Sequence, residues 1–127
     1  MTEYVIDASA FLAIIRDEPG SDIATARLSG AMMSAVNMSE ALMRGVEKGA
    51  PLDLMRGFLA AQQVRVVPFD DELAVAAALL RPKTKRLGLS FADRACIATA
   101  LARDATIVTA DRAWATLDLP CKIELIR

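Results

Sequence analysis

The sequence contains no histidine. This absence excludes mechanisms that use an imidazole base, such as Ser-His-Asp triads and Cys-His pairs, and every zinc site with a histidine ligand. Cysteine is scarce as well, because Cys96 and Cys121 are the only two and form no CxxC pair. We expect both to be reduced, packed thiols. The groups left for chemistry are carboxylates, hydroxyls, lysine, arginine and a bound metal ion.

Long apolar runs are also absent, and aromatic residues are few. The longest stretch without a charged residue, 28–39, includes Ser, Gly and Asn, so it is too short and too polar to span a bilayer. Acids at positions 3 and 7 exclude a signal peptide. We therefore expect a cytoplasmic protein without a membrane partner. With 5% aromatic residues, its core has to be aliphatic.

The size and charge of the chain are those of one small domain. It has 127 residues and is 54% hydrophobic and 24% charged, which predicts a single globular domain over residues 1–127. The formal net charge of −1 gives no general basic signature of a nucleic-acid binder. Any such binding has to use a local patch.

Short apolar runs alternate with helical patterns along the whole chain. The runs at 4–6, 31–35, 64–67, 106–109 and 123–126 predict strands. Helices are expected between them, including one that opens at Asn37 or Ser39 and one from Ser90 to about Arg103. This order predicts an α/β fold with a central parallel sheet of four or five strands, flanked by helices on both faces.

Four acids stand near the ends of the predicted strands: Asp7, Glu40, Asp93 and Asp111. Asp7 directly follows the first strand, and Asp111 comes two residues after the fourth. Glu40 and Asp93 fall in the first turns of predicted helices. Because open α/β sheets bind ligands beyond the carboxyl ends of their strands, we expect the four side chains to line one crevice.

Each acid also has a purely structural explanation. Asp7 and Asp111 can cap the helices that follow them, and the other two stand at capping-box spacing from Asn37 and Ser90. Capping, however, does not require four acids at one edge. Like charges in a crevice repel by roughly several kcal/mol unless they are protonated or bridged by cations. A divalent ion is the simplest counter-charge.

An all-oxygen ligand set favours Mg²⁺ or Mn²⁺. One or two such ions can lower the pKa of an attacking water and stabilise the leaving oxygen of a phosphodiester. Ser9 and Thr109 lie two residues from Asp7 and Asp111. Their hydroxyls are candidates to orient the carboxylates or metal-bound waters, with local backbone capping as the alternative.

Four segments together resemble the PIN-domain ribonucleases, and most closely the VapC-type toxins of toxin–antitoxin pairs. They are VIDASA at 5–10, Ser39-Glu40, LSFAD at 89–93 and TADRA at 109–113. The resemblance covers essentially the whole chain. It implies a Rossmann-like three-layer fold and a Mg²⁺- or Mn²⁺-dependent endoribonuclease that hydrolyses RNA phosphodiester bonds.

The resemblance also implies roles for individual residues. The catalytic and metal-binding set is Asp7, Glu40, Asp93 and Asp111, and the supporting polar residues are Ser9, Thr109 and Asn37. The family members pair with themselves and with a cognate VapB-type antitoxin that covers the active site. We therefore expect a homodimer and such an antitoxin as partners. Trp114 either anchors a partner or packs in the core.

RNA binding needs positive charge near the acids. The one dense basic segment, expected as a loop, contains Arg81, Lys83, Lys85 and Arg86. It is either a rim that tracks phosphates or a solvated surface. Arg94 and Arg112 adjoin two of the acids, where they contact a phosphate or balance charge.

Two other functions fit the sequence less well. The first is an α/β phosphatase or phosphotransferase with Asp7 as nucleophile. Enzymes of that type use a second acid two residues on, where this chain has Ser9, and the chain has no glycine-rich phosphate loop. The second is a non-catalytic RNA-binding PIN module, which is expected to lack one or more of the four acids.

Overall fold

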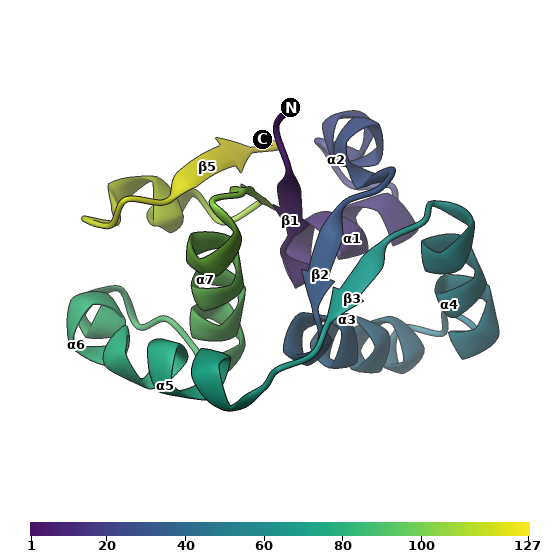
Figure 1. Ribbon diagram of the computed structural model, residues 1–127. Coiled ribbons are helices and arrows are strands. Elements are labelled where there is room, and N and C mark those ends of the chain that lie inside the picture. The colour runs from purple at the N-terminus through teal and green to yellow at the C-terminus, as the bar shows by residue number, and fades with distance from the viewer.

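The computed structural model describes all 127 residues and has a sheet of five parallel strands at its centre (Figure 1). The order is β3-β2-β1-β4-β5. The strands are β1 (Tyr4–Ile6), β2 (Met32–Ser34), β3 (Arg65–Val67), β4 (Thr106–Thr109) and β5 (Lys122–Leu125). Since every pairing is parallel, all carboxyl ends lie along one edge. The predicted parallel sheet is confirmed.

Helices cover both faces of the sheet, as the three-layer fold requires. One face carries α1 (Ala8–Ile15), α2 (Ser21–Leu28), α3 (Ala35–Glu47) and α4 (Leu52–Ala61). The other carries α5 (Asp71–Leu79) and α7 (Phe91–Arg103), with the short α6 (Arg81–Thr84) and the 3₁₀ turns η1 (Lys85–Leu87) and η2 (Arg112–Thr116). None of these helices has the length and apolar character needed to cross a membrane.

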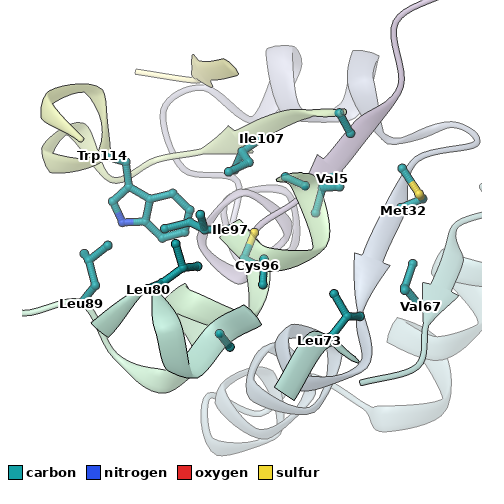
Figure 2. Close-up of a cluster of buried hydrophobic side chains, with 14 residues drawn as sticks. Val5, Met32, Val67, Leu73, Leu80, Leu89, Cys96, Ile97, Ile107 and Trp114 are labelled. Carbon is teal, nitrogen blue, oxygen red and sulfur yellow. The ribbon is translucent and has the colours of Figure 1, made fainter. Parts of the chain in front are cut away.

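Two hydrophobic cores lie on the opposite faces because strand side chains alternate. Val5 packs in the core under α5 and α7, whereas its neighbour Ile6 packs in the core under α1 to α4. Figure 2 shows the first of these cores, in which Trp114 is 1% exposed and lies with Leu80, Leu89 and other aliphatic side chains. Trp114 is therefore a core residue, and its side chain is not exposed for contact with a partner protein.

The start of α3 corrects one expectation. The helix begins at Ala35, because Ser34 at the end of β2 accepts a 3.2 Å hydrogen bond from the Val36 N–H and caps it. Asn37 is therefore inside the helix, and it forms no capping box with Glu40. Glu40 lies in the second helical turn and not in the first.

The basic segment at 81–86 is helical and is not a loop. Proline fits the first turn of a helix, where its missing N–H costs nothing, and Pro82 lies there in α6. The Thr84 hydroxyl donates a 2.9 Å hydrogen bond to the Leu80 carbonyl and ties the turn to the end of α5. The basic side chains thus stand on two short helical turns.

Candidate active site

A cleft of about 410 Å³ opens at the carboxyl edge of the sheet. It is lined by all four predicted acids, Asp7, Glu40, Asp93 and Asp111, and by Ser9. The acids come from four different places: the end of β1, the second turn of α3, the first turn of α7 and the turn after β4. Folding therefore brings together residues that are up to 104 positions apart in the chain.

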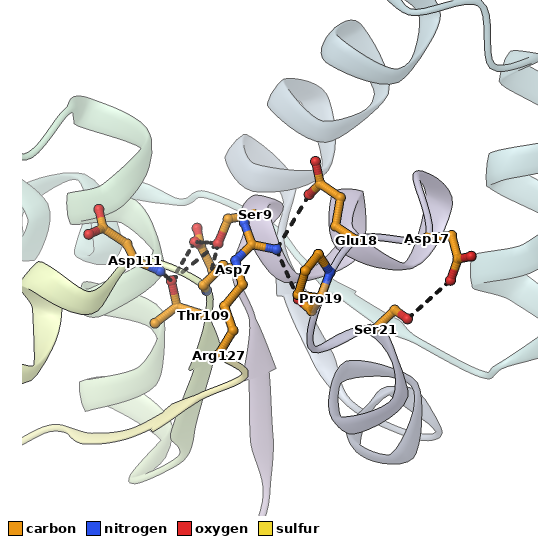
Figure 3. Close-up of polar contacts among 10 residues, drawn as sticks. Asp7, Ser9, Asp17, Glu18, Pro19, Ser21, Thr109, Asp111 and Arg127 are labelled. Carbon is orange, nitrogen blue, oxygen red and sulfur yellow. Dashed lines mark hydrogen bonds and ion pairs between the residues drawn. The ribbon is translucent and has the colours of Figure 1, made fainter.

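Asp7 is the most buried of the four acids. It is 4% exposed and directly follows the central strand. Its Oδ2 accepts a 2.6 Å hydrogen bond from the Ser9 hydroxyl and a 2.9 Å hydrogen bond from Thr109 Oγ1, on the neighbouring strand β4 (Figure 3). These two hydroxyls, 3.2 Å apart, hold the carboxylate in one orientation. Of the two roles that the sequence left open for these hydroxyls, they perform the first here, since they orient a carboxylate.

The same hydroxyls also hold the chain around Asp111. The Asp111 N–H donates to Thr109 Oγ1 at 3.1 Å, and the Ala110 N–H donates to Ser9 Oγ at 3.0 Å. The Asp111 side chain caps η2, since its Oδ1 accepts a 3.0 Å hydrogen bond from the Ala113 N–H. Thr109 thus connects two of the four acids.

Asp93 forms the capping box expected from its spacing. Its Oδ2 accepts from the Ser90 N–H at 2.9 Å, and the Ser90 hydroxyl accepts from the Asp93 N–H at 3.1 Å. Capping therefore anchors Asp93 at the cleft and leaves its other oxygen uncommitted.

The remaining acid, Glu40, pairs with a residue on its own helix. Its Oε2 lies 3.3 Å from Arg44 Nη2, one turn further along α3. Each of the four acids thus uses one oxygen in a hydrogen bond or ion pair, while the other accepts no side-chain hydrogen bond. The cleft therefore presents several carboxylate oxygens without protein partners.

Two of the four acids, Asp7 and Glu40, have raised pKa values. Burial raises the pKa of Asp7 above its ordinary 3.8, and the negative charge of Asp93 adds to this, while Ser9 and Thr109 oppose it. Burial also raises the pKa of Glu40, with Asp7 and Asp93 contributing and Arg44 opposing. A positively charged ligand in the cleft would relieve both effects.

The donor set fits a hard divalent cation. No three acidic side chains in the structure converge closely enough to enclose an ion by themselves. Mg²⁺, however, keeps several waters and is commonly held by one or two carboxylates together with substrate phosphates. Four carboxylates around one open cleft, each with an unpaired oxygen, suit that mode of binding.

Asn37 lies behind the cleft and does not line it. It is fully buried, and its Nδ2 donates a 2.8 Å hydrogen bond to the Ala92 carbonyl. Glu40 lies one helical turn after Asn37 on α3, and Asp93 is the residue directly after Ala92 on α7. This single bond therefore ties together the two helices that carry these acids.

None of the six predicted RNA-contact residues lines the cleft. Arg94 is engaged in the fold, because its Nη1 donates to the Ala77 carbonyl at 3.1 Å and its guanidinium lies 5.9 Å from the Phe91 ring centre. The other five are exposed on short helical turns: Arg81, Lys83, Lys85, Arg86 and Arg112.

The cleft is lined instead by four charged residues that the sequence analysis did not select: Arg16, Glu18, Arg44 and Arg127. Arg127 is held by the Pro19 carbonyl at 3.0 Å and by Glu18 at 3.6 Å, as Figure 3 shows. The i,i+4 spacing from Glu40 could have identified Arg44. No local pattern marks Arg16, Glu18 or Arg127, because the tertiary fold alone brings them to the acids.

The fold is shared with toxin–antitoxin proteins. The VapBC complex of Salmonella typhimurium bound to DNA matches with a TM-score of 0.77 and 18% identity, covering 100% of both chains. A toxin–antitoxin complex of Klebsiella pneumoniae matches with a TM-score of 0.80 and 15% identity, over 98% of each chain. VapBC-5 of Mycobacterium tuberculosis matches with a TM-score of 0.58 and 26% identity, over 100% of this chain and 99% of that one.

At the level of sequence, the family model described as PIN domain matches residues 4–119. No curated protein sequence matches the chain. The chain belongs to the PIN domain family. The predicted similarity to VapC-type toxins is also confirmed, since the structural matches include several VapBC complexes.

Proposed function

We propose that this protein is a Mg²⁺- or Mn²⁺-dependent endoribonuclease and the toxin of a VapBC-type toxin–antitoxin pair. The observation that carries the proposal is the cleft in which Asp7, Glu40, Asp93 and Asp111 meet, each with one uncommitted carboxylate oxygen. The PIN domain family and the fold shared with a VapBC complex support the proposal. The absence of histidine excludes an imidazole base, and metal ions held by carboxylates offer another route to phosphodiester hydrolysis.

The four carboxylates would hold one or two divalent ions. The bound ion supplies an activated water and neutralises charge on the reacting phosphate. Asp7 is fixed for this task by Ser9 and Thr109, so that little reorganisation is needed when a ligand arrives. Asp93 and Asp111 are fixed by the backbone N–H groups that they cap.

Asn37 serves in this proposal as a positioning residue. Its bond to the Ala92 carbonyl sets the distance between Glu40 on α3 and Asp93 on α7. It touches neither ion nor substrate. Its loss is therefore expected to act through the separation of the two acids.

The partners follow from the same similarity. VapBC relatives are complexes of toxin and antitoxin, and we infer a VapB-type antitoxin for this chain. We also propose self-association into a homodimer. Expression of the toxin without its antitoxin should arrest growth.

The decisive experiment is cleavage of RNA by purified protein with Mg²⁺, Mn²⁺ or EDTA. We expect internal cuts that require the metal and are lost in Asp7→Asn and Asp93→Asn, with each variant's fold checked by circular dichroism. RNA binding without cleavage by the wild type would instead favour a non-catalytic module. A phosphorylated Asp7 intermediate would favour the phosphotransferase.

A further inference from the structure

Two hollows on the surface share a pair of arginines. The acidic cleft is one of them. The other, of about 350 Å³, is lined by Arg16, Met43, Arg44, Glu47 and Lys48. Since Arg16 and Arg44 line both, the acidic cleft continues past these two side chains into the second hollow. We refer to Arg16, Arg44 and Lys48 as the basic groove.

The basic groove is formed by the ends of two packed helices. Arg16 follows the last residue of α1, Arg44 lies in the last turn of α3, and Lys48 follows the end of α3. Asp7 lies at the opposite end of α1. Eight helical residues span about 12 Å, so the groove begins at Arg44, beside Glu40, and extends away from Asp7.

The cations of the groove are available to a ligand. Arg16 and Lys48 have exposed side chains that make no ion pair and no hydrogen bond with the protein. Arg44 pairs with Glu40 through Nη2 alone, at 56% side-chain exposure. Its other guanidinium nitrogens are unpaired. Glu47 is the only acid that lines the second hollow.

We propose that the basic groove binds the phosphates of the RNA strand on one side of the scissile bond. This inference rests on the proposed function. An acidic cleft repels a polyanion, and arginine and lysine beside it offset that repulsion while leaving the acids free for metal. The groove therefore sets the direction in which the strand crosses the cleft.

The groove also offers a contact for a base. Met43 is 51% exposed and lines the same hollow. The thioether of Met43 is flexible and polarisable, so it can pack against the face of any base without a preference for one base over another. The chemistry of the groove thus fits a single-stranded nucleic acid, with phosphate contacts at the cations and an apolar contact at Met43.

This assignment differs from a rim at residues 81–86. Those basic side chains are on α6 and η1 and line neither hollow. Two sets of lysine and arginine can therefore be compared in one protein. The groove proposal requires that only the set at Arg16 and Lys48 follows the RNA strand from the acids.

The test is the salt dependence of RNA binding, measured by fluorescence anisotropy with a labelled single-stranded RNA in EDTA. In Arg16→Gln/Lys48→Gln, the negative slope of log K against log salt should become less steep by about 1.4, because each single-strand phosphate contact contributes about −0.7. With Mg²⁺ present, KM for cleavage by this variant should rise and kcat should stay unchanged.

Two control variants change charge outside the groove. Lys83→Gln/Lys85→Gln, with the same change of charge, should keep the wild-type slope. Arg56→Gln should also keep the wild-type slope, because Arg56 is exposed on α4 and lines neither hollow.

The outcomes separate the two proposals. A wild type that neither binds nor cleaves RNA overturns the proposed function and the groove with it. A wild type that cleaves RNA, combined with an unchanged slope in Arg16→Gln/Lys48→Gln, overturns the groove alone. Loss of slope in Lys83→Gln/Lys85→Gln only would assign RNA binding to residues 81–86. Binding of an acidic protein that weakens in Arg16→Gln/Lys48→Gln, with the RNA slope unchanged, would assign the groove to that partner.

Discussion

Thr109 and Asp7 are joined side chain to side chain across neighbouring strands, with Thr109 Oγ1 donating to Asp7 Oδ2 at 2.9 Å. Thr109 Oγ1 also accepts a 3.1 Å hydrogen bond from the Asp111 N–H. One buried hydroxyl therefore orients two acids of the candidate site. Its position at the end of β4 makes the geometry of the cleft depend on the register of the central sheet.

Replacement of Thr109 by valine tests this link. Valine keeps the shape but removes the hydroxyl, which leaves the Asp111 N–H without its partner, so we expect a loss of about 1–3 kcal/mol in the free energy of unfolding. RNA cleavage should fall about 10–100-fold, as is typical when a group that orients a metal ligand is removed. Thr109→Ser restores the hydroxyl and should recover most of the activity. Equal activity of both variants would contradict the link.

Asp7 is expected to destabilise the fold in the absence of divalent ions. Its folded-state pKa is raised above 3.8, first by burial. As the pH rises through 3.8, the unfolded state ionises first, so stability falls and the penalty is complete above the folded-state pKa. Asp7→Asn should therefore unfold at higher urea than the wild type at pH 7 in EDTA, while losing activity.

The pH dependence provides the control for this prediction. The advantage of Asp7→Asn should shrink as the pH falls toward 3.8 and vanish below it, because the wild-type carboxyl is then protonated in both states. Asp53→Asn, an exposed change of the same kind on α4, is the control for the change of charge itself. A constant difference between wild type and Asp7→Asn across pH would argue against the raised pKa as its cause.

Divalent ions should reverse that penalty in the wild type. A ligand that binds only the folded state at about 100 times its Kd adds about 2.7 kcal/mol of stability. We therefore expect Mn²⁺ to raise the Tm of the wild type, EDTA to abolish the increase, and Asp93→Asn to reduce it. A buffer without Mn²⁺, brought to the same ionic strength with Na⁺, separates this effect from screening. An equal Tm increase in wild type and Asp93→Asn would place the ion elsewhere.

Asn37 offers a test of positioning. Replacing it with leucine keeps a similar volume but removes the donor to the Ala92 carbonyl, with an expected cost of about 1–3 kcal/mol. If Asn37 sets the spacing of Glu40 and Asp93, then activity should require more Mn²⁺ in Asn37→Leu, while KM for RNA changes little. A purely structural role would lower Tm without changing the metal requirement.

Gly20 determines how the end of the chain reaches the cleft. It has a φ of +91°, and a Cβ there would collide with the Ile126 carbonyl oxygen, next to Arg127. Gly20→Ala should lower the free energy of unfolding by more than about 1 kcal/mol. Gly30→Ala shares the positive φ, at +72°, but has open space around it. The excess loss in Gly20→Ala, measured by urea unfolding, reports the collision alone.

Local sequence patterns predicted most of the framework. The β-branched run at Thr106–Thr109 and the apolar run at Tyr4–Ile6 are strands over the predicted residues, because buried parallel strands require short apolar segments. The Ser90–Asp93 capping box also formed as its spacing indicated. The predicted start of α3 was wrong, because Ser34 and not Asn37 caps the helix.

The sequence by itself placed Asp7 and Asp111 at the cleft, because the carboxyl ends of parallel strands lie at the same edge of a sheet. Glu40 and Asp93 reach it from the helices α3 and α7, which pack against each other at that edge. The tertiary structure alone decided which charged residues outside α3 line the cleft: Arg16, Glu18 and Arg127. Arg16 and Arg127 are far apart in sequence and follow no shared period, and they meet the acids only because α1 packs beside α3 and the segment after β5 turns back to Pro19. Long side chains at element ends are placed by packing, which no local pattern encodes.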